Sequence, residues 1–212
     1  WFRYSNCEVY SLMVATVNNT MKKIGSTVVV GAGGASSINF TAIPGTYTDL
    51  CIKLSSRTTV SGDYDALRMT INSSTGTYSN IFVYAPDNTQ GSTSVSGQAQ
   101  LRWLNTAEGD TSTTNTFGNF EIYIPNYASS NAKGMLVDAV VEKNATTGAS
   151  LVLGAGLWSG VGAITDISIY QNAYNFKQYT TATLYGISAT PNTTKASGGI
   201  IYQDATYMYH VF

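Results

Sequence analysis

The chain has 212 residues, of which 43% are hydrophobic but only 11% are charged, against about 25% charged residues in an average globular domain. Eleven basic and twelve acidic residues leave a net charge of −1, so no charge excess would attract a nucleic-acid backbone or an anionic membrane. The scarcity of Glu, Lys and Arg argues against a coiled coil, and 15 Tyr, 7 Phe and 3 Trp argue against a disordered chain.

The two ends of the chain differ in character from its body. Residues 1–24 are expected to form an N-terminal extension or arm, and their first twelve residues lack the basic start and apolar core of a signal peptide. Residues 189–212 are expected to form a linker followed by a terminal strand or the start of a C-terminal module. The remaining residues, 25–188, have the length of one large β-sandwich domain.

Short β-branched and aromatic runs alternate with turn residues in the first half of this domain. After Val28-Val-Val30, the Gly31-Ala-Gly-Gly34 segment lacks the Gly-Lys-Ser/Thr ending of a phosphate-binding loop, and we interpret it as a turn. Hydrophobic residues then alternate with polar ones, as in strands with one buried face, in segments 37–43, 47–57 and 67–71. Cys51 lies in such a segment and is interpreted as a buried structural thiol rather than as a disulfide partner of Cys7.

The second half of the domain continues this pattern and contains no recognisable amphipathic helix. Strands are predicted at 78–85, 98–104, 117–127, 134–143, 150–159, 164–169 and 180–187. Segments 134–143 and 150–159 are mostly apolar, so we expect them to be buried on both faces. Two polar segments, 87–97 and 105–115, are predicted to be loops. Eight to ten strands suffice for two packed sheets, which predicts an all-β, jelly-roll-like antiparallel β-sandwich.

Little in the sequence points to catalysis or to metal binding. His210 is the single histidine, and no Ser or Cys nucleophile signature accompanies it. Asp63 and Asp65 have no third carboxylate nearby and no EF-hand frame, so we interpret them as part of an exposed turn. A glycosidase pair remains an alternative, because two carboxylates across a cleft would suffice, and its candidates are Glu108, Asp110, Asp138 and Glu142. We predict a non-enzyme without a cofactor or a metal.

Aromatic side chains offer a second kind of site, because their rings stack on sugar faces. The candidate glycan contacts are Trp103, Tyr127, Trp158 and Tyr174, although most aromatic residues of a sandwich belong to its core. The polar segments 87–97 and 105–115 are the best candidates for further hydrogen bonds to a glycan.

An ordered set of motifs covers most of the chain. The set begins with Gly31-Ala-Gly-Gly-Ala-Ser-Ser-Ile-Asn-Phe-Thr-Ala-Ile-Pro-Gly-Thr-Tyr-Thr-Asp-Leu50. It continues with Lys53-Leu-Ser-Ser-Arg57, Glu121-Ile-Tyr-Ile-Pro-Asn-Tyr127, Gly156-Leu-Trp-Ser159, Ala163-Ile-Thr-Asp-Ile-Ser-Ile169 and Ala182-Thr-Leu-Tyr-Gly-Ile187. In this order the motifs resemble a family of virion surface proteins common in marine tailed bacteriophages. Some longer relatives carry a glycine-rich module, and residues 195–212 resemble its beginning.

This resemblance implies a non-enzymatic structural protein of the virion surface, in the form of a capsid decoration, head fibre or tail fibre. It implies capsid or tail proteins as partners, a homo-oligomer with a trimer favoured, and adhesion to host-surface glycans. It transfers no catalytic residue, and no nucleic-acid or membrane partner is expected. The alternatives are a stand-alone carbohydrate-binding module and a tailspike depolymerase domain. A surface rich in Ser, Thr and Asn suits an extracellular particle, because its hydrogen bonds are less sensitive to salt than ion pairs are.

Overall fold

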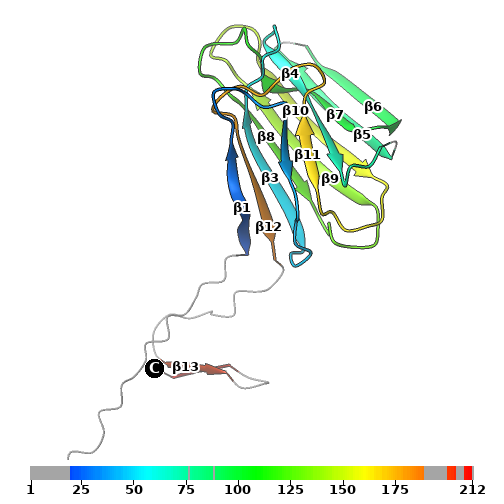
Figure 1. The fold of residues 1–212 in the computed structure, drawn as a ribbon, viewed down its shortest axis with the longest axis vertical. Helices are drawn as coiled ribbons and strands as arrows, with labels where there is room; N and C mark the ends of the chain where they lie inside the picture. Colours follow the sequence, from blue (N-terminus) through cyan, green and yellow to red (C-terminus); the bar gives the residue numbers. More distant parts are fainter. Residues whose placement is uncertain (1–19, 76, 88, 189–199, 204–207, 212) are drawn as a thin grey trace, which may run out of the picture. The chain divides into compact units, whose positions relative to one another are not determined.

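A computed structural model describes residues 20–75, 77–87, 89–188, 200–203 and 208–211. Every regular element in this part of the chain is a β-strand (Figure 1), which confirms the all-β prediction. The strands are β1 (Met21–Val29), β2 (Ser37–Phe40), β3 (Asp49–Ser56), β4 (Tyr64–Ile71), β5 (Tyr78–Pro86), β6 (Gly91–Gln98), β7 (Leu101–Glu108), β8 (Gly118–Ile124), β9 (Lys133–Val141), β10 (Ser150–Trp158), β11 (Ile167–Tyr170), β12 (Thr181–Ile187), β13 (Ile200–Gln203) and β14 (Met208–Val211).

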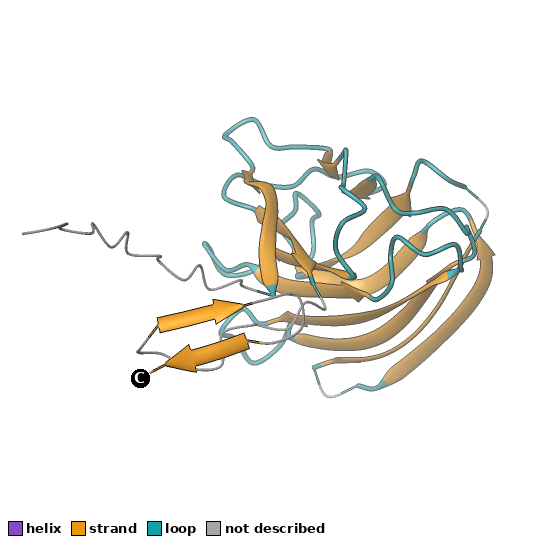
Figure 2. Ribbon diagram, turned by 90° about the horizontal axis from the view of Figure 1, so that it is seen from below, coloured by secondary structure: helices purple, strands orange, loops and turns teal. Residues whose placement is uncertain are grey.

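Strands β1 to β12 form two antiparallel sheets. The larger sheet has the order β1-β12-β3-β8-β9-β10-β5-β6, and the smaller has the order β2-β11-β4-β7. Figure 2 shows the smaller sheet on one side of the larger one. The predicted β-sandwich is therefore confirmed. Residues Met21–Ala189 form one compact unit, and β13 and β14 pair with each other in a separate two-stranded sheet.

The strand pairing has a nested order. Strand β1 pairs with β12, β2 with β11, β3 with β8, and β4 with β7. Early and late strands therefore pair as the two arms of one long ribbon, and the ribbon is rolled so that β12 also pairs with β3 and β11 with β4. Two hairpins interrupt the arms, namely β5–β6 after β4 and β9–β10 after β8. They join through β10 and β5 and extend the larger sheet beyond β8.

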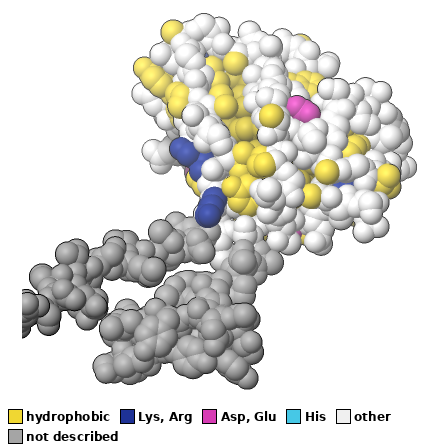
Figure 3. Space-filling model, turned by 60° about the horizontal axis from the view of Figure 1, so that its bottom comes forward, with side chains coloured by type: hydrophobic (Ala, Val, Ile, Leu, Met, Phe, Trp, Pro, Cys, Tyr) yellow, Lys and Arg dark blue, Asp and Glu magenta, His cyan; other side chains and the backbone are white. Residues whose placement is uncertain are grey.

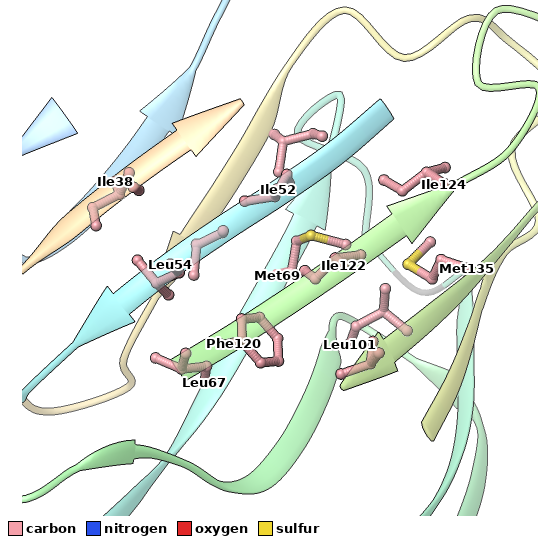
Figure 4. Close-up of a cluster of buried hydrophobic side chains, with 14 of the residues drawn as sticks. Ile38, Ile52, Leu54, Leu67, Met69, Leu101, Phe120, Ile122, Ile124 and Met135 are labelled. Atoms are coloured by element: carbon pink, nitrogen blue, oxygen red, sulfur yellow. The ribbon is translucent and has the colours of Figure 1, made fainter. Parts of the chain in front are cut away.

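The core lies between the two sheets, because alternate residues of each strand point inward. Trp103 of β7 is fully buried, and its ring lies 5.7 Å from that of Phe120 on β8 at a tilt of 54°. Figure 4 shows Phe120 and Ile122 of β8 directed towards Leu67 and Met69 of β4. These side chains come from opposite sheets, so their burial holds the two layers together.

Three edge strands differ from the sequence prediction. Segment 87–97 was expected to be a loop, but residues Gly91–Gln98 form β6, which pairs with β5 along its length. Its Ser, Thr and Gly residues carry no apolar alternation, and backbone hydrogen bonds to β5 are sufficient to hold an edge strand. Strand β1 starts at Met21, within the segment expected to be an arm, and residues 105–108 belong to β7 rather than to a loop.

Cys51 is a free thiol in β3 and is 3% exposed, which confirms its interpretation as a buried cysteine. Burial raises its pKa to about 11, with a further contribution from neighbouring Glu121. The thiol donates a hydrogen bond to Glu121 Oε1 at 3.5 Å. Cys7 lies outside the described residues.

Candidate functional site

The outer side of the larger sheet carries an exposed aliphatic surface on the inserted strands β5, β9 and β10. Burial alternates strictly along β9 and β10, so every second side chain points away from the core. The outward residues include seven large aliphatic side chains that are 41–56% exposed. We call this set the aliphatic face: Ile81, Val83, Leu136, Val140, Leu151, Leu153 and Leu157.

The strand register makes the aliphatic face continuous. Leu151 of β10 lies between Ala85 of β5 and Val140 of β9. Two residues further along β10, Leu153 pairs with Val83 and Asp138. Side chains directly opposite each other in an antiparallel pair have Cβ atoms about 4.5–5.5 Å apart. The three strands therefore present contiguous apolar rows rather than isolated residues.

A hollow of about 540 Å³ lies where the aliphatic face meets β6. Apolar walls are provided by Val83, Leu151 and Leu153, and the polar rim comes from Gln90 and Ser92. The hollow has no titratable lining residue other than Tyr84. Its lining is therefore mainly apolar and carries no charged side chain.

The neighbouring part of the same outer surface, on β3 and β8, is polar. Lys53 forms an ion pair with Glu121, and the Glu121 hydrogen bond raises the pKa of Lys53. The Tyr123 hydroxyl donates to Asp49 Oδ2 at 2.6 Å, and this hydrogen bond raises the pKa of Tyr123. Exposed aliphatic residues of the larger sheet therefore concentrate on the inserted strands.

A second candidate site lies at the loop end of the sandwich, where Arg57 anchors residues 110–116. The Arg57 side chain follows β3, and the residue is only 6% exposed. Its guanidinium donates hydrogen bonds to the backbone oxygens of Asp110 at 3.1 Å, Ser112 at 2.8 Å, Thr113 at 2.8 Å and Thr116 at 3.1 Å. One buried cation therefore ties four backbone oxygens of this segment together, alongside the backbone hydrogen bonds from Asp110 and Thr111 to the 60–62 loop.

This anchored segment borders a hollow of about 250 Å³. Asp110 and Lys177 form an ion pair at its edge, and the hydrogen bond from Lys177 lowers the pKa of Asp110. Tyr179 is 65% exposed and has a φ of 70°, which is an outlier for a bulky residue. The complete lining is Arg57, Asp110, Thr114, Asn115, Phe117, Lys177, Gln178 and Tyr179.

Glu108 is a buried acid beside this loop end. The residue is fully buried, and its two carboxylate oxygens have no hydrogen-bond partner of normal geometry among the described residues. Burial raises the pKa of Glu108, while the nearby Ser112 side chain and the positive charge of Arg57 oppose this rise. Compared with an exposed glutamate, the fold therefore shifts the protonation equilibrium of this side chain towards its neutral form.

Glu108→Gln is expected to stabilise the protein increasingly as the pH rises above about 4.5, the ordinary pKa of the group. Because the pKa of Glu108 is higher in the folded state than in the unfolded state, the wild type loses stability as the pH rises from the unfolded-state pKa to the folded-state pKa. The loss is about 1.4 kcal/mol for each pH unit between these two pKa values. The neutral amide of the variant removes this loss. Urea unfolding between about pH 4 and pH 8 measures the free energy of unfolding of both proteins. A difference in this free energy between the two proteins that stays constant with pH would contradict the prediction.

Three of the four candidate glycan contacts are core residues, which corrects their assignment. Trp103 and Tyr127 are fully buried and Trp158 is 4% exposed, so their rings cannot stack on a sugar at the surface. The Tyr127 hydroxyl instead donates to Pro44 O, and the Trp158 ring lies 5.7 Å from Lys133 Nζ. Tyr174 is 42% exposed and remains a candidate. Tyr179 could not be identified as a candidate from the sequence, because its exposure depends on an irregular turn.

The acids considered for catalysis do not share a hollow. The backbone of Glu142 lies beside the Glu108 carboxyl group, but the Glu142 residue is exposed whereas Glu108 is buried. Among the candidate acids only Asp110 lines either of the two hollows, and Asp138 lies on the outer side of β9. Asp63 pairs with Lys143 at 2.6 Å, and Asp65 is half-buried and accepts a hydrogen bond from Thr58. No group of three or more His, Cys, Asp or Glu residues that could hold a metal ion occurs among the described residues.

Segments 134–143 and 150–159 were expected to be buried on both faces, and this prediction is wrong. One face of β9 and of β10 is buried, and the other face is exposed. The surface viewed in Figure 3 shows few Lys, Arg, Asp or Glu side chains and several groups of hydrophobic side chains. Within the described ranges, no helix is long and apolar enough to cross a membrane.

Comparison with known proteins found no matching family model, no matching curated protein and no matching solved structure.

Proposed function

We propose that this chain is a non-enzymatic structural protein of a bacteriophage virion surface. In this proposal it folds as a jelly-roll-like sandwich and is attached in repeated copies to capsid or tail proteins as a homo-oligomer. The family resemblance of the motifs between Gly31 and Ile187 supplies the class of particle.

The nested strand pairing is the observation that carries this proposal. Without the inserted hairpins, the sandwich reduces to two four-stranded sheets, β1-β12-β3-β8 and β2-β11-β4-β7. Early strands pair with late ones throughout, as in a rolled ribbon. Double-sheet jelly rolls of this general kind occur in viral capsid proteins and in lectins. This architecture supports a virion role.

The surface chemistry supports the same role. A protein displayed in many copies needs a surface for assembly, and the aliphatic face offers one. The remaining surface is poor in charge, so its polar contacts depend little on ionic strength. These properties fit a structural component in a saline environment.

The test is the protein composition and structure of the phage particle that encodes the chain. Gradient-purified virions are analysed by mass spectrometry and then by cryo-EM. We expect the chain in stoichiometric, symmetric copies on the capsid or tail, with density for a two-layer β domain. Recovery of the chain only in the soluble fraction of the lysate, with none in the particles, would refute the proposal.

Glycan binding at the loop-end hollow is a second candidate function. The exposed, left-handed Tyr179 favours it, because strained residues cost about 1–3 kcal/mol and cluster at ligand sites. Asn115, Asp110 and Lys177 supply hydrogen-bonding groups around the same hollow. Adhesion to host-surface glycans would complement the virion role, whereas a glycan-binding monomer absent from particles would favour a stand-alone carbohydrate-binding module.

Tyr179→Ala is expected to weaken glycan binding about ten-fold, because stacking on an aromatic face contributes on the order of 1 kcal/mol or more. A glycan array identifies the ligand, and titration calorimetry measures the affinity. Tyr185→Ala is the matched control, since Tyr185 lies on β12 and does not line the hollow. Equal losses for both variants would argue against the hollow as the site. Release of new reducing ends from a bound polysaccharide would instead favour a tailspike depolymerase.

A further inference from the structure

We propose that the aliphatic face is where a second copy of this chain packs, outer sheet against outer sheet. This inference rests on the proposed assembly role and names the surface that performs it. The face belongs to the inserted strands β5, β9 and β10, while β3 and β8 of the rolled ribbon carry polar groups on the same side. The insertions therefore add to the sandwich the part of the sheet that exposes its aliphatic residues.

The first argument is the kind of residue exposed. A sheet with one solvated face ordinarily places polar residues on that face. Here both faces of β10 are apolar, and the outward residues Leu151, Leu153 and Leu157 are 56, 51 and 41% exposed. In the described part of the chain the smaller sheet covers only the other side (Figure 2). Burial of these leucines requires an additional layer.

The second argument is the area that the face offers. Seven aliphatic side chains at 41–56% exposure present on the order of 600 Å² of apolar surface, the upper end for a monomer's largest patch. A standard protein interface buries about 800 Å² on each partner. With the flanking Ala85, Ala155 and Ser92, the face reaches the size that a stable dimer needs.

The third argument is the complementarity of the face to itself. On the exposed side of β10, Leu153 and Ala155 are neighbours, two residues apart along the strand. On the exposed side of β9, Gly134 lies at one end of the strand and Val140 at the other. We place a two-fold axis between the outer faces of two copies, perpendicular to the strands and level with the midpoint between Leu153 and Ala155. It places Leu153 of one copy opposite Ala155 of the other, and Val140 opposite Gly134. The same axis places Leu151 opposite Leu157 and Asp138 opposite Leu136. Large residues therefore meet small ones over part of the face, across two sheets about 10 Å apart.

The face carries one charged residue. In the outward rows of β5, β9 and β10 it is Asp138, which lies between Glu121 of β8 and Leu153 of β10, so two-fold packing must accommodate one carboxylate from each copy. A net charge of −1 gives two copies little mutual repulsion. A partner selected by charge would need several complementary groups, and Asp138 is the one charged residue that these outward rows offer. The observations thus favour a second copy over a charged heterologous partner.

The experiment is sedimentation velocity of the full chain between 1 and 100 µM, with Leu153→Lys and Val83→Lys as variants. Wild type is expected to sediment as a dimer or an even multiple, and each variant as a 22.6 kDa monomer with self-association weakened at least a hundred-fold. Both side chains point outward, so the variants are expected to keep the wild-type circular dichroism spectrum. Val161→Lys is the matched control, because Val161 is 61% exposed and lies outside the face.

Three results would overturn the inference. One is a wild-type protein that stays monomeric over the whole range, including a chain that assembles only after capsid or tail proteins are added. Another is wild-type assembly that both lysine variants retain, which would place the interface elsewhere while leaving the virion proposal intact. A wild-type trimer, the state implied by the family resemblance, would exclude the two-fold packing. Conversely, if the lysine variants are monomers and the wild type is a dimer, the assignment of the aliphatic face holds even if the chain is absent from virions.

Discussion

Replacing Arg57 with Met is expected to lower the free energy of unfolding by about 3–5 kcal/mol. Methionine keeps part of the apolar stem but removes the guanidinium. The four backbone oxygens of residues 110–116 that accept hydrogen bonds from it would lose their shared donor. Buried Glu108 would also lose the positive charge that opposes the rise in its pKa. Equilibrium unfolding in guanidinium chloride measures the change.

Arg102→Met is the matched control for this prediction. Arg102 lies on β7 and is exposed, so the same substitution there is expected to change stability by no more than about 0.5 kcal/mol. Hydrogen exchange adds a local readout, because residues 110–116 of the Arg57 variant should lose protection before the rest of the sandwich does. Equal stabilities of the two variants would show that Arg57 does not anchor this segment.

Gly109→Ala is expected to destabilise the fold by about 3 kcal/mol. A Cβ atom at Gly109 would overlap the carbonyl group of Gly62. The two backbones cannot separate easily, because Gly109 N donates to Asp63 O at 2.9 Å and Asp110 N donates to Val60 O at 2.7 Å. The added methyl group must therefore break these hydrogen bonds or distort both loops. Thermal and chemical unfolding measure the loss.

Gly33→Ala provides the comparison for Gly109. A Cβ atom at Gly33 meets no atom within 4 Å, so we expect its stability to be unchanged or slightly raised through a less flexible unfolded chain. If Gly109→Ala were as stable as Gly33→Ala, the backbone contact between the 60–63 and 109–111 loops would not be tight in solution. The loop-end hollow would then lack a rigid frame.

Strands with one apolar face were predictable from the sequence. The alternation of Leu50, Ile52 and Leu54 identifies β3, and that of Phe120, Ile122 and Ile124 identifies β8, because a period of two places these residues on one side. All six are buried by 99% or more. Strand β6 was missed for the same reason, since an edge strand of Gly, Ser and Thr has no apolar period and is held by backbone pairing.

The candidate sites were less accessible to sequence analysis. Trp103 and Tyr127 have the residue type of glycan contacts, but the rolled pairing of distant strands buries them. Tyr179 and the hollow beside it depend on Arg57, which is more than fifty residues from the segment it anchors. Such long-range hydrogen bonds leave no local pattern, because the residues that make them are separated in sequence.

The sequence by itself determined that this is a charge-poor, all-β chain with a large apolar core, since composition and a period of two depend only on local residue order. It also showed that 134–143 and 150–159 are apolar on both sides. Only the tertiary structure decided what that means. Because β9 and β10 lie in the part of the larger sheet that extends beyond β8, their inner residues are buried and their outer leucines and valines are exposed. Burial is a property of neighbouring layers, which a single strand's sequence does not encode.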